Sequence, residues 1–567
     1  MNSIVVLILG ALGLALGYGW YAKSIDRGVL QPDAKKATPA KMYMDGVDFT
    51  PASANVLFGY QFKSIAALGP ITGPIIAVTW GWLPALVWII FGTIFIGWVQ
   101  DYGSMFMSVR REGDTMAALS YKLISPRARS ILMIFIYFYL LLIMGAFGNA
   151  VGKVLMTNPK VPLGMIAVIL AGVLAGQMTY KWKQDIILTT VVTVVLSFVG
   201  IWLSTLPAVS NFFSAFYGLP ESPTIFLGNT QAQVLGTLLV IIFCYLGSVL
   251  PIWSFAQPIN YVSFWIIALG MLGGVIGMLI WRPGMGDFPV FRGFMAHGPM
   301  WPMLMVTIAC GAISGWHSLV STSGTARQLE KETDALPVGA GAMFMEMALA
   351  VIAFLTATVA FGGWQGYQDA GGAGKALAVF AGGLANFLDH IGIPHDFGVA
   401  YGSVFLTIMA LTIMQLVVRF MRVASAELVG DKMPAMKNVH VGTIVALILT
   451  LIFVWIIPWL TIWAAFGAAN QLMAGLALML VALWLMAEGK KHTWALYPSV
   501  FMIVTTLAAL LYLAYTNFFV KLPAAETAQA SIASILVGLI GLVLIVAAVF
   551  LIVDGWKALS KPKEEAA

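Results

Sequence analysis

Apolar runs of about 18 residues or more recur along the whole sequence. Each run is long enough to cross the hydrocarbon core of a bilayer as an α-helix, which takes about 20 residues. Only 10% of the 567 residues are charged and 60% are hydrophobic, whereas a soluble domain carries roughly 25% charged residues. No water-soluble fold could bury so much apolar surface, and the sequence lacks the alternating short strands of a membrane β-barrel. It therefore predicts an all-α polytopic membrane protein.

The apolar runs predict about 15 membrane-spanning helices, joined mostly by short connections. The predicted spans are residues 2–21, 64–80, 83–108, 127–156, 162–180, 184–206, 231–255, 258–281, 299–320, 336–363, 396–426, 438–460, 466–488, 493–517 and 529–555. The longer connections are residues 22–63, 207–230 and 364–395. The last of these contains the stretch GKALAVFAGGLANFLDHIGI, which we expect to form an amphipathic helix on the membrane surface.

Lysine and arginine set the predicted orientation, because they gather in cytoplasmic loops. With the N-terminus outside, 24 of the 30 Lys and Arg residues fall in inner loops and 6 in outer loops. Lys63, Lys561 and Lys563 are among those assigned to the inside. No basic residue precedes the first span, so we expect a retained helix and not a signal peptide. The same bias explains the net charge of +6, which we do not interpret as a sign of a nucleic-acid partner.

The span at 64–80 carries two helix breakers in its middle. Its sequence, SIAALGPITGPIIAVTW, contains Gly69-Pro70 and Gly73-Pro74 on either side of Thr72. Proline removes one backbone hydrogen bond and blocks another, and unpaired backbone in hydrocarbon costs several kcal/mol per group. Such backbone survives where it is buried in protein or lines a cavity, as at the binding sites of transporters. We therefore interpret these five residues as substrate-binding candidates, with a simple proline kink as the alternative.

Two further spans contain interruptions. The span at 231–255 has Gly247, Ser248 and Pro251 in its inner half, and we add these three to the substrate-binding candidates. The span at 299–320 ends in ACGAISGWHSLVSTSGTA, which is dense in Gly, Ser and Thr. Small residues allow helices to approach closely, and hydroxyl groups can bind a cation or bond across helices.

The interrupted spans predict an inverted repeat. The span at 64–80 runs outward, and the span at 231–255 comes five segments later and runs inward. The arrangement resembles the LeuT-like five-plus-five core of the amino acid/polyamine/organocation superfamily, with broken first and sixth core helices. That resemblance implies a sodium site at the first and eighth core helices, with Ser321, Thr322 and Ser323 as ligand candidates. The predicted segments are residues 1–63 (N-terminal helix and cytoplasmic loop), 64–206 (first five-helix unit), 207–230 (external loop), 231–426 (second unit) and 427–567 (four helices and a short cytoplasmic tail).

Ionisable and amide side chains inside spans are candidates for coupling or gating, because charge in the bilayer is costly. Glu346 lies ten residues into its span, and burial favours the protonated form of a carboxyl group, which suits proton carriage. Asp101 lies near a cytoplasmic end, and His317 can change charge near neutral pH. Each also has a structural interpretation: a hydrogen bond between helices, a cap or ion pair, or a packed imidazole. Asn470 and Gln471 either join helices or act in gating.

Other protein classes are poorly supported. The sequence has no HExxH or GxSxG motif, and GGAGKA lacks the Ser/Thr and the first Gly of a phosphate loop. Cys244 and Cys310 lie in apolar spans and suggest neither a disulfide framework nor a zinc site. We therefore expect no enzyme activity and no cofactor, apart from Na⁺ or H⁺ as a coupling ion. A passive channel and a membrane-embedded sensor of nutrient state remain as alternatives to a transporter.

Several stretches resemble the carbon starvation protein (CstA) family. They are FGYQFKSIAALGPITGPIIAVTWGWLP, VQDYGSMFMSVRREG, GSVLPIWSFAQPINY, VTIACGAISGWHSLVSTSGT, GAMFMEMALA and FGAANQLMAGLALML, in this order within residues 50 to 515. The resemblance implies secondary active import of peptides or pyruvate across the bacterial inner membrane during nutrient limitation, by ion-coupled alternating access. It implies a small-molecule substrate and contact with lipid, and it leaves a homo-oligomer open. Family members often carry histidine where this chain has Tyr60 and Gln61, and an Arg-Asp pair where it has Ile259 and Asn260.

Overall fold

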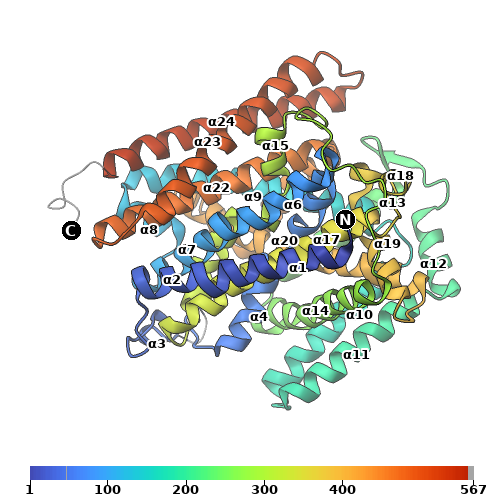
Figure 1. The fold of residues 1–567 in the computed structure, drawn as a ribbon, viewed down its shortest axis with the longest axis horizontal. Helices are drawn as coiled ribbons and strands as arrows, with labels where there is room; N and C mark the ends of the chain where they lie inside the picture. The colour runs from blue at the N-terminus through green and yellow to red at the C-terminus, as the bar shows by residue number, and fades with distance from the viewer. Residues whose placement is uncertain (46–47, 560–567) are drawn as a thin grey trace.

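Long helices packed side by side make up the protein (Figure 1). The computed structural model describes residues 1–45 and 48–559. The end of α24 lies at the left edge of the bundle in Figure 1, and the start of α1 lies right of centre. Lys561 and Lys563 of the predicted cytoplasmic tail lie outside the described residues.

The helices follow one another along the chain with few strands. The α-helices are α1 (Ser3–Leu14), α2 (Lys23–Ile25), α3 (Pro39–Met42), α4 (Ala54–Ile65), α5 (Gly69–Ala77), α6 (Trp82–Gly92), α7 (Trp98–Arg110), α8 (Met116–Leu123), α9 (Pro126–Gly148), α10 (Pro162–Gly176), α11 (Ile186–Ser204), α12 (Pro207–Tyr217), α13 (Gln231–Val249), α14 (Ala256–Trp281), α15 (Met300–Thr307), α16 (Gly315–Ser323), α17 (Gly341–Thr358), α18 (Trp364–Asp369), α19 (Ala376–Asp389), α20 (His395–Val429), α21 (Val439–Ile456), α22 (Trp459–Ala487), α23 (Thr493–Tyr515) and α24 (Ala528–Leu559). Short 3-10 and π segments join several of them, including η3 (Val78–Trp80) and η8 (Ala309–Gly311). Strands β1 (Thr224–Phe226) and β2 (Asn229–Thr230) form an antiparallel hairpin.

In the described part of the chain, 13 helices are long and apolar enough to cross a membrane. They correspond to 13 of the predicted spans. The two remaining predicted spans, 64–80 and 299–320, are the two whose helices are interrupted. The count of 15 is thus replaced by 13 continuous spans, or up to 14 if the bent pair containing the first of these segments is one span.

The first interrupted segment is longer than predicted. Helices α4 and α5 with η3 form a pair bent by 49°, and the break falls between Ile65 and Gly69. The predicted cytoplasmic loop at 22–63 is therefore wrong in two places. The first helix continues to Leu30, and α4 occupies the end of the supposed loop. As a result Lys63, which was assigned to an inner loop, lies in a helix and is fully buried.

The predicted break within 231–255 is wrong. Helix α13 is continuous, and Gly247 and Ser248 lie in its last turn. Pro251 follows the helix, and Leu250 before it is extended, as expected for the residue that precedes a proline. This proline ends a helix and does not interrupt one.

The second break lies in the Gly/Ser/Thr-rich stretch of residues 299–323. Helix α15 ends at Thr307, η8 makes one tight turn, and α16 begins at Gly315. Ala309 within the turn has a φ of 38°, in the left-handed region. The small residues in this stretch permit the backbone to leave the helix here.

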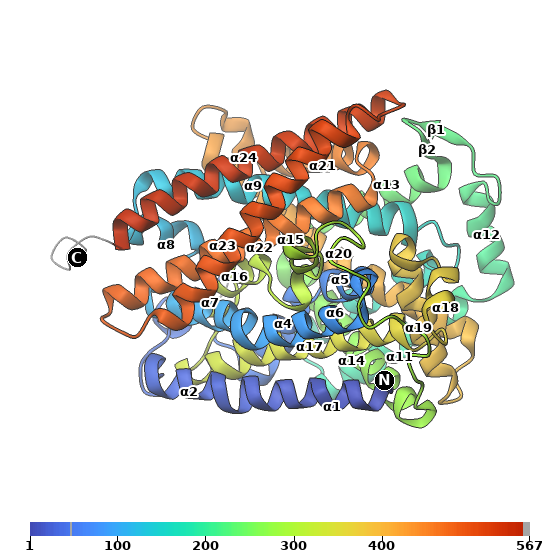
Figure 2. The ribbon, with the colours of Figure 1, turned by 45° about the horizontal axis from the view of Figure 1, so that its top comes forward.

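The two broken segments pack directly against each other near the centre of the molecule (Figure 2). A Cβ atom on Gly69 would lie 2.5 Å from the Cβ atom of Cys310. A Cβ atom on Gly73 would lie 2.7 Å from the backbone Cα of Ile308. The glycines of the GPxxGP stretch therefore allow a close backbone approach that no larger residue permits.

The stretch predicted to lie on the membrane surface is a helix inside the bundle. Helix α19 packs along α20 and also contacts α5. Ten of its 14 residues are buried. Its two adjacent glycines explain the close packing in part, because a Cβ atom on Gly383 would lie 2.6 Å from the Cβ of Thr356.

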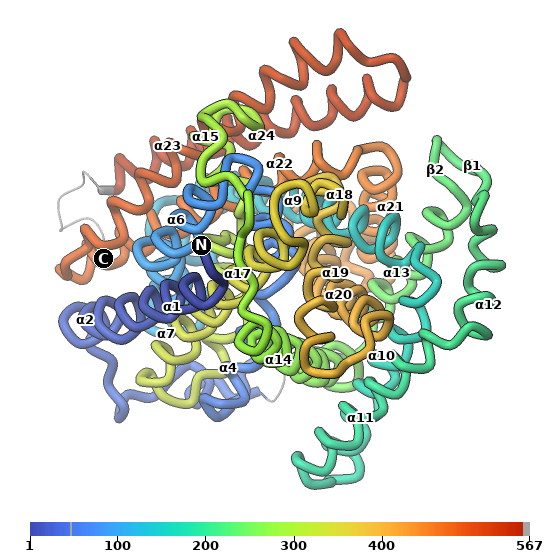
Figure 3. Tube along the Cα trace, turned by 45° about the vertical axis from the view of Figure 1, so that its right-hand side comes forward, coloured from blue at the N-terminus to red at the C-terminus, as the bar shows by residue number. Residues whose placement is uncertain are grey.

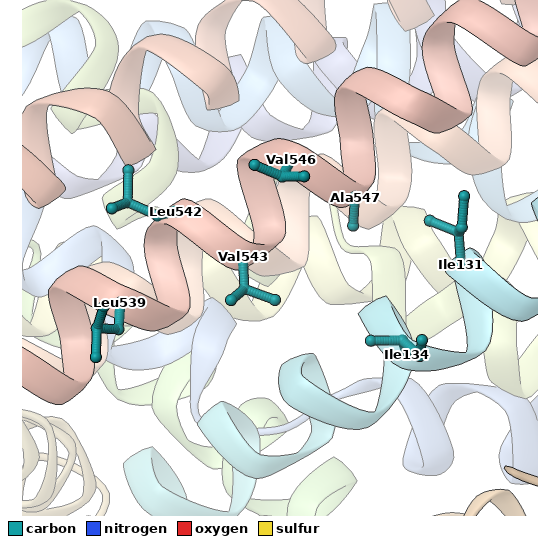
Figure 4. A pocket seen from close by; sticks show the side chains of 7 residues that line it. All are labelled: Ile131, Ile134, Leu539, Leu542, Val543, Val546 and Ala547. Carbon is teal, nitrogen blue, oxygen red and sulfur yellow. The ribbon is translucent and has the colours of Figure 1, made fainter.

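The periphery is aliphatic. Helix α11 lies at one edge of the molecule and the α23–α24 pair at another (Figure 3). An open groove of about 360 Å³ runs between α24 and α9. Its lining is entirely aliphatic (Figure 4): Ile131, Ile134, Leu539, Leu542, Val543, Val546 and Ala547. Such a surface suits contact with lipid chains and offers no chemistry.

We predict that Gly73→Ala destabilises the protein, because the added methyl group would meet the backbone of Ile308. Overpacking of this kind costs about 1–3 kcal/mol. The melting temperature in detergent should fall by several degrees. Gly59→Ala in α4 is the matched control, since its Cβ would lie 3.9 Å from Phe264. Equal melting temperatures for the two variants would contradict the close approach.

Candidate functional site

Three ionisable side chains that the sequence singled out separately meet beside the second break. His317 in α16 places Nδ1 2.8 Å from Oδ2 of Asp101 in α7. Its other ring nitrogen, Nε2, lies 3.2 Å from Oε2 of Glu346 in α17. All three side chains are 0% exposed. An imidazole thus lies between two buried carboxyl groups, hydrogen-bonded to Asp101 and within charge-pairing distance of Glu346, and we call these three side chains the ionisable line.

Polar neighbours fix the Asp101 end of this line. The Gln100 amide, in the orientation that satisfies both of its ends, donates to Asp101 Oδ1 at 2.6 Å and to the Ser314 carbonyl at 2.9 Å. Its oxygen accepts from the Ser318 backbone N–H at 3.0 Å. The arginines that follow in α7 do not take this role: Arg110 pairs with Glu332 and Arg111 with Glu488. Among the described residues, Asp101 is therefore held by His317 of α16 and by Gln100, and not by Arg110 or Arg111.

Asn470 in α22 holds the start of α16. Its Oδ1 accepts hydrogen bonds from Tyr139 Oη at 2.6 Å, Ser314 Oγ at 3.1 Å and the Trp316 backbone N–H at 3.2 Å. Its Nδ2 lies 3.4 Å from the sulfur of Cys310. One amide therefore joins α9, η8 and α16, which agrees with the interpretation that it joins helices.

Gln471 donates hydrogen bonds to carbonyl groups that the same break leaves without a helical partner. Its Nε2 donates to the carbonyls of Met305 at 2.9 Å and Ala309 at 3.3 Å. The Trp88 indole in α6 also donates to Met305, at 3.1 Å. Side chains of neighbouring helices thus replace the lost helical hydrogen bonds, as buried unwound backbone requires.

The two breaks are also hydrogen-bonded to each other. The Trp316 indole N–H in α16 donates to the carbonyl of Ser64, at the end of α4, at 2.8 Å. Because Trp316 precedes His317, this bond joins the first break to the ionisable line. The Trp316 side chain therefore adds a hydrogen bond to the direct packing between the two broken segments.

Lys63 is a functional candidate that sequence reasoning missed. It lies in α4, two residues before the helix ends, and its side chain is fully buried. Its Nζ lies 2.5 Å from Thr412 Oγ1 in α20, and its charge interacts with that of Glu346. The signal was present in the sequence: a lysine directly before a broken apolar span. Placing the span boundary at residue 64 assigned it to a loop.

The hydroxyl groups of the three predicted sodium ligands have different hydrogen-bond partners. Ser321 Oγ accepts a hydrogen bond from Gln61 Nε2 in α4 at 3.0 Å, and Thr325 donates to the Gln61 oxygen. Thr322 Oγ1 donates to the carbonyl of Ser318 at 2.8 Å, and Ser323 bonds back to its own helix in the same manner. Of the three, Ser321 is the one that reaches the first broken segment.

Among the candidates in the first broken segment, Thr72 Oγ1 donates to the carbonyl of Leu68 within its own helix, and Pro70 lies against Gly311 of η8. The candidates in α13 lie at its cytoplasmic-side end by the predicted orientation. Their carbonyls are already bound: Arg419 in α20 donates to Gly247, and Arg422 donates to Ser248. The structure does not bring this group into the ionisable line.

A sulfur atom lies close to the ionisable line. Cys310 Sγ, a His317 ring nitrogen and a Glu346 carboxylate oxygen all lie within 4.8 Å of one another. A metal site would have similar spacing, but His317 and Glu346 already face each other as an ion pair. We therefore assign the group to charge pairing. Cys310 and Cys244 are both free and buried.

Comparison with known proteins places the chain in a family. The family model described as "Carbon starvation protein CstA" matches residues 2–365 and 365–509. The chain belongs to the carbon starvation protein CstA family. The resemblance seen in the sequence motifs is thereby confirmed.

Curated relatives of this family member cover most of its length. It is 27% identical to the peptide transporter CstA of Campylobacter jejuni, over 89% of this chain and 79% of the relative. It is 25% identical to the peptide transporter CstA of Escherichia coli K12, over 90% of this chain and 81% of the relative. It is 26% identical to the pyruvate/proton symporter BtsT of Escherichia coli K12, over 63% and 49%. Among solved structures, MhsT in complex with L-phenylalanine has a TM-score of 0.45 and 15% identity, over 89% of this chain and 99% of that chain.

We predict that Asn470→Leu lowers the melting temperature in detergent by several degrees. The change leaves three buried donors without their acceptor, and an unsatisfied buried group costs about 1–3 kcal/mol. Asn517→Leu is the matched control, because the Asn517 amide is also buried but donates to Leu513 of its own helix. A smaller fall in melting temperature for Asn470→Leu than for Asn517→Leu would contradict the role of Asn470 in holding the break.

Proposed function

We propose that this protein is a proton-coupled secondary active transporter that imports small carbon and nitrogen sources, peptides or pyruvate, by alternating access. The observation that carries the proposal is the buried line of Asp101, His317 and Glu346 beside a break in a membrane helix. The relatives named above, the peptide transporter CstA and the pyruvate/proton symporter BtsT, favour the same class of function and these substrates.

Protons are favoured over sodium because of the chemistry of the buried side chains. His317 and the two carboxyl groups that flank it can each gain or lose a proton, and none of them is exposed to water. A change of one charge in a low-dielectric interior has a large energetic effect. A conformation that opens this line to one side of the membrane would therefore bind protons differently from a closed one, which is what coupling requires.

Alternating access would be carried by the two broken segments. The contact of α5 with η8 supports a pairing of the first and eighth core helices, in units 64–206 and 231–426. The second break then belongs to the third helix of the second unit and not to its first. The Gly69–Pro74 stretch would form part of the substrate site. We further propose a bacterial inner-membrane location with the C-terminus in the cytoplasm, as the distribution of Lys and Arg indicates.

The decisive measurement is uptake of labelled pyruvate or dipeptide into proteoliposomes under an imposed pH gradient, an imposed sodium gradient, or neither. We expect accumulation above the equilibrium level with the pH gradient. Accumulation that never exceeds equilibrium under any gradient would contradict the proposal and leave a passive channel or a sensor.

Glu346→Gln should abolish accumulation driven by the pH gradient while sparing exchange of labelled for unlabelled substrate, because the amide cannot carry the proton. Glu488→Gln is the matched control, since Glu488 forms a solvent-exposed pair with Arg111. We expect accumulation by the control variant to match the wild type. Unchanged accumulation in Glu346→Gln would assign Glu346 to structure.

Sodium coupling is the alternative, through the hydroxyl group of Ser321. If sodium drives uptake, Ser321→Ala should raise the sodium concentration needed for half-maximal uptake. Thr322→Ala is the comparison, because that hydroxyl bonds to its own helix. Uptake by the wild type that is independent of sodium would remove this alternative.

A further inference from the structure

We propose, on the basis of the transport function proposed above, that Lys63 binds the carboxylate group of the substrate. We propose further that the arriving negative charge causes Glu346 to take up the transported proton. The substrate class is then a small molecule with a free carboxylate, such as a 2-oxo acid or the C-terminal end of a short peptide.

Lys63 is a buried cation that contacts no anion among the described residues. Across residues 1–45 and 48–559, the hydrogen bond that its Nζ makes is to the hydroxyl of Thr412, at 2.5 Å. An ammonium group has three donors, and a hydroxyl group brings no negative charge. Burying a charge without a partner is costly in protein and more so in a membrane. A carboxylate beside Nζ would supply the missing acceptors and a negative charge in direct contact.

The surroundings of Lys63 offer further groups for a carboxylate. Gln415 lies one turn after Thr412 in α20, so the two side chains share a face of that helix. The Gln415 side chain is fully buried, and neither its oxygen nor its nitrogen has a hydrogen-bond partner among the described residues. Gly247 of α13 lies against it: a Cβ atom there would be 2.4 Å from Gln415 Oε1. An unsatisfied amide at this depth costs about as much as a lost hydrogen bond, which a bound ligand would recover.

Lys63 also lies close to the two breaks, where the negative charge of a bound substrate could affect both. Lys63 lies at the end of α4, just before the first break, and Ser64 next to it is bonded to Trp316 of the second broken segment. The site therefore lies at the junction that alternating access would open and close. A carboxylate bound beside Nζ would lie between α20 and the end of α4, next to the first break.

Charge balance connects the carboxylate to the proton. Four groups act on Glu346: His317 from α16, Asp101 from α7 and Lys63 from α4 by charge, and Cys310 from η8 by proximity. In the substrate-free state that we propose, both carboxyl groups are ionised, His317 is protonated and Lys63 is charged, so that the positive and negative charges cancel. A substrate carboxylate adds one negative charge, and the cancellation is restored when Glu346, whose oxygens lack a hydrogen bond, accepts a proton. The proton comes from the aqueous solution: an O–H bond of hydronium breaks as the Glu346 O–H bond forms, and no other bond changes.

The test compares binding of a carboxylate with binding of its neutral amide to the purified full-length protein in detergent, by calorimetry without any ion gradient. The probes are pyruvate against pyruvamide, and dialanine against dialanine amide. We expect the wild type to prefer the carboxylate of at least one pair by about tenfold or more, since hydrogen bonds to charged groups are the stronger ones. The pair that shows the preference identifies the source of the carboxylate. Equal binding of carboxylate and amide in both pairs would overturn the proposal without any variant.

Lys63→Met should bind the carboxylate no better than the amide. Lys153→Met is the matched control, because Lys153 lies in another helix and its Nζ donates to the Val454 carbonyl. We expect the control to keep the wild-type preference. A carboxylate preference that survives in Lys63→Met would overturn the assignment of Lys63.

Proton uptake tests the second statement of the proposal, that carboxylate binding causes Glu346 to accept a proton. In weakly buffered solution with a pH indicator dye, the wild type should take up about one proton for each carboxylate bound. Glu346→Gln should bind the carboxylate and take up none. Carboxylate binding without proton uptake by the wild type would overturn the coupling to Glu346. These outcomes are separate from the transport function: gradient-driven accumulation can persist when Lys63 proves irrelevant, and carboxylate preference can persist when accumulation fails.

Discussion

Unwound backbone inside a membrane protein must find its hydrogen-bond partners in the protein, because hydrocarbon offers none. The second break of this protein meets that demand with side chains from neighbouring helices. Gln471 and Trp88 bind its carbonyl groups, and Asn470 binds the start of α16. Because these partners come from α6 and α22, the position of the break depends on the packing of the whole centre of the bundle.

The ionisable side chains are held by that same scaffold. His317 lies two residues after the start of α16, so its ring is oriented by the contacts that fix that helix end. Asp101 and Glu346 then approach it from opposite sides, on α7 and α17. The separation of roles is clear: amide and indole groups hold the backbone, while carboxyl, imidazole and ammonium groups provide charge.

Much of the helical architecture could be predicted from the sequence, because runs of about 20 apolar residues have few other folds available. The meaning of a Gly/Pro signal could not. Pro74 lies inside α5, whereas Pro251 simply follows the end of α13, and only the position of the helix end distinguishes them. The same uncertainty about helix ends concealed Lys63.

The contact between Asp101, His317 and Glu346 could not be predicted from the sequence either. The three residues were identified singly from their depth, but they come from three spans separated by more than 25 residues of chain. Which faces of three helices meet is decided by packing, and apolar faces toward lipid and toward protein look alike in a sequence.

Helix α22 has an implication for how the chain is assembled during synthesis. It is the most enclosed of the long spans described, with 94% of its apolar window buried. Its amide at Gln471 binds the Ala309 carbonyl, 162 residues earlier in the chain. At roughly 5–20 residues per second, the ribosome needs on the order of 8–30 s to bridge that interval. During this interval Gln471 has not yet been translated. The insertion machinery or water therefore has to provide hydrogen-bond partners for the backbone of the break.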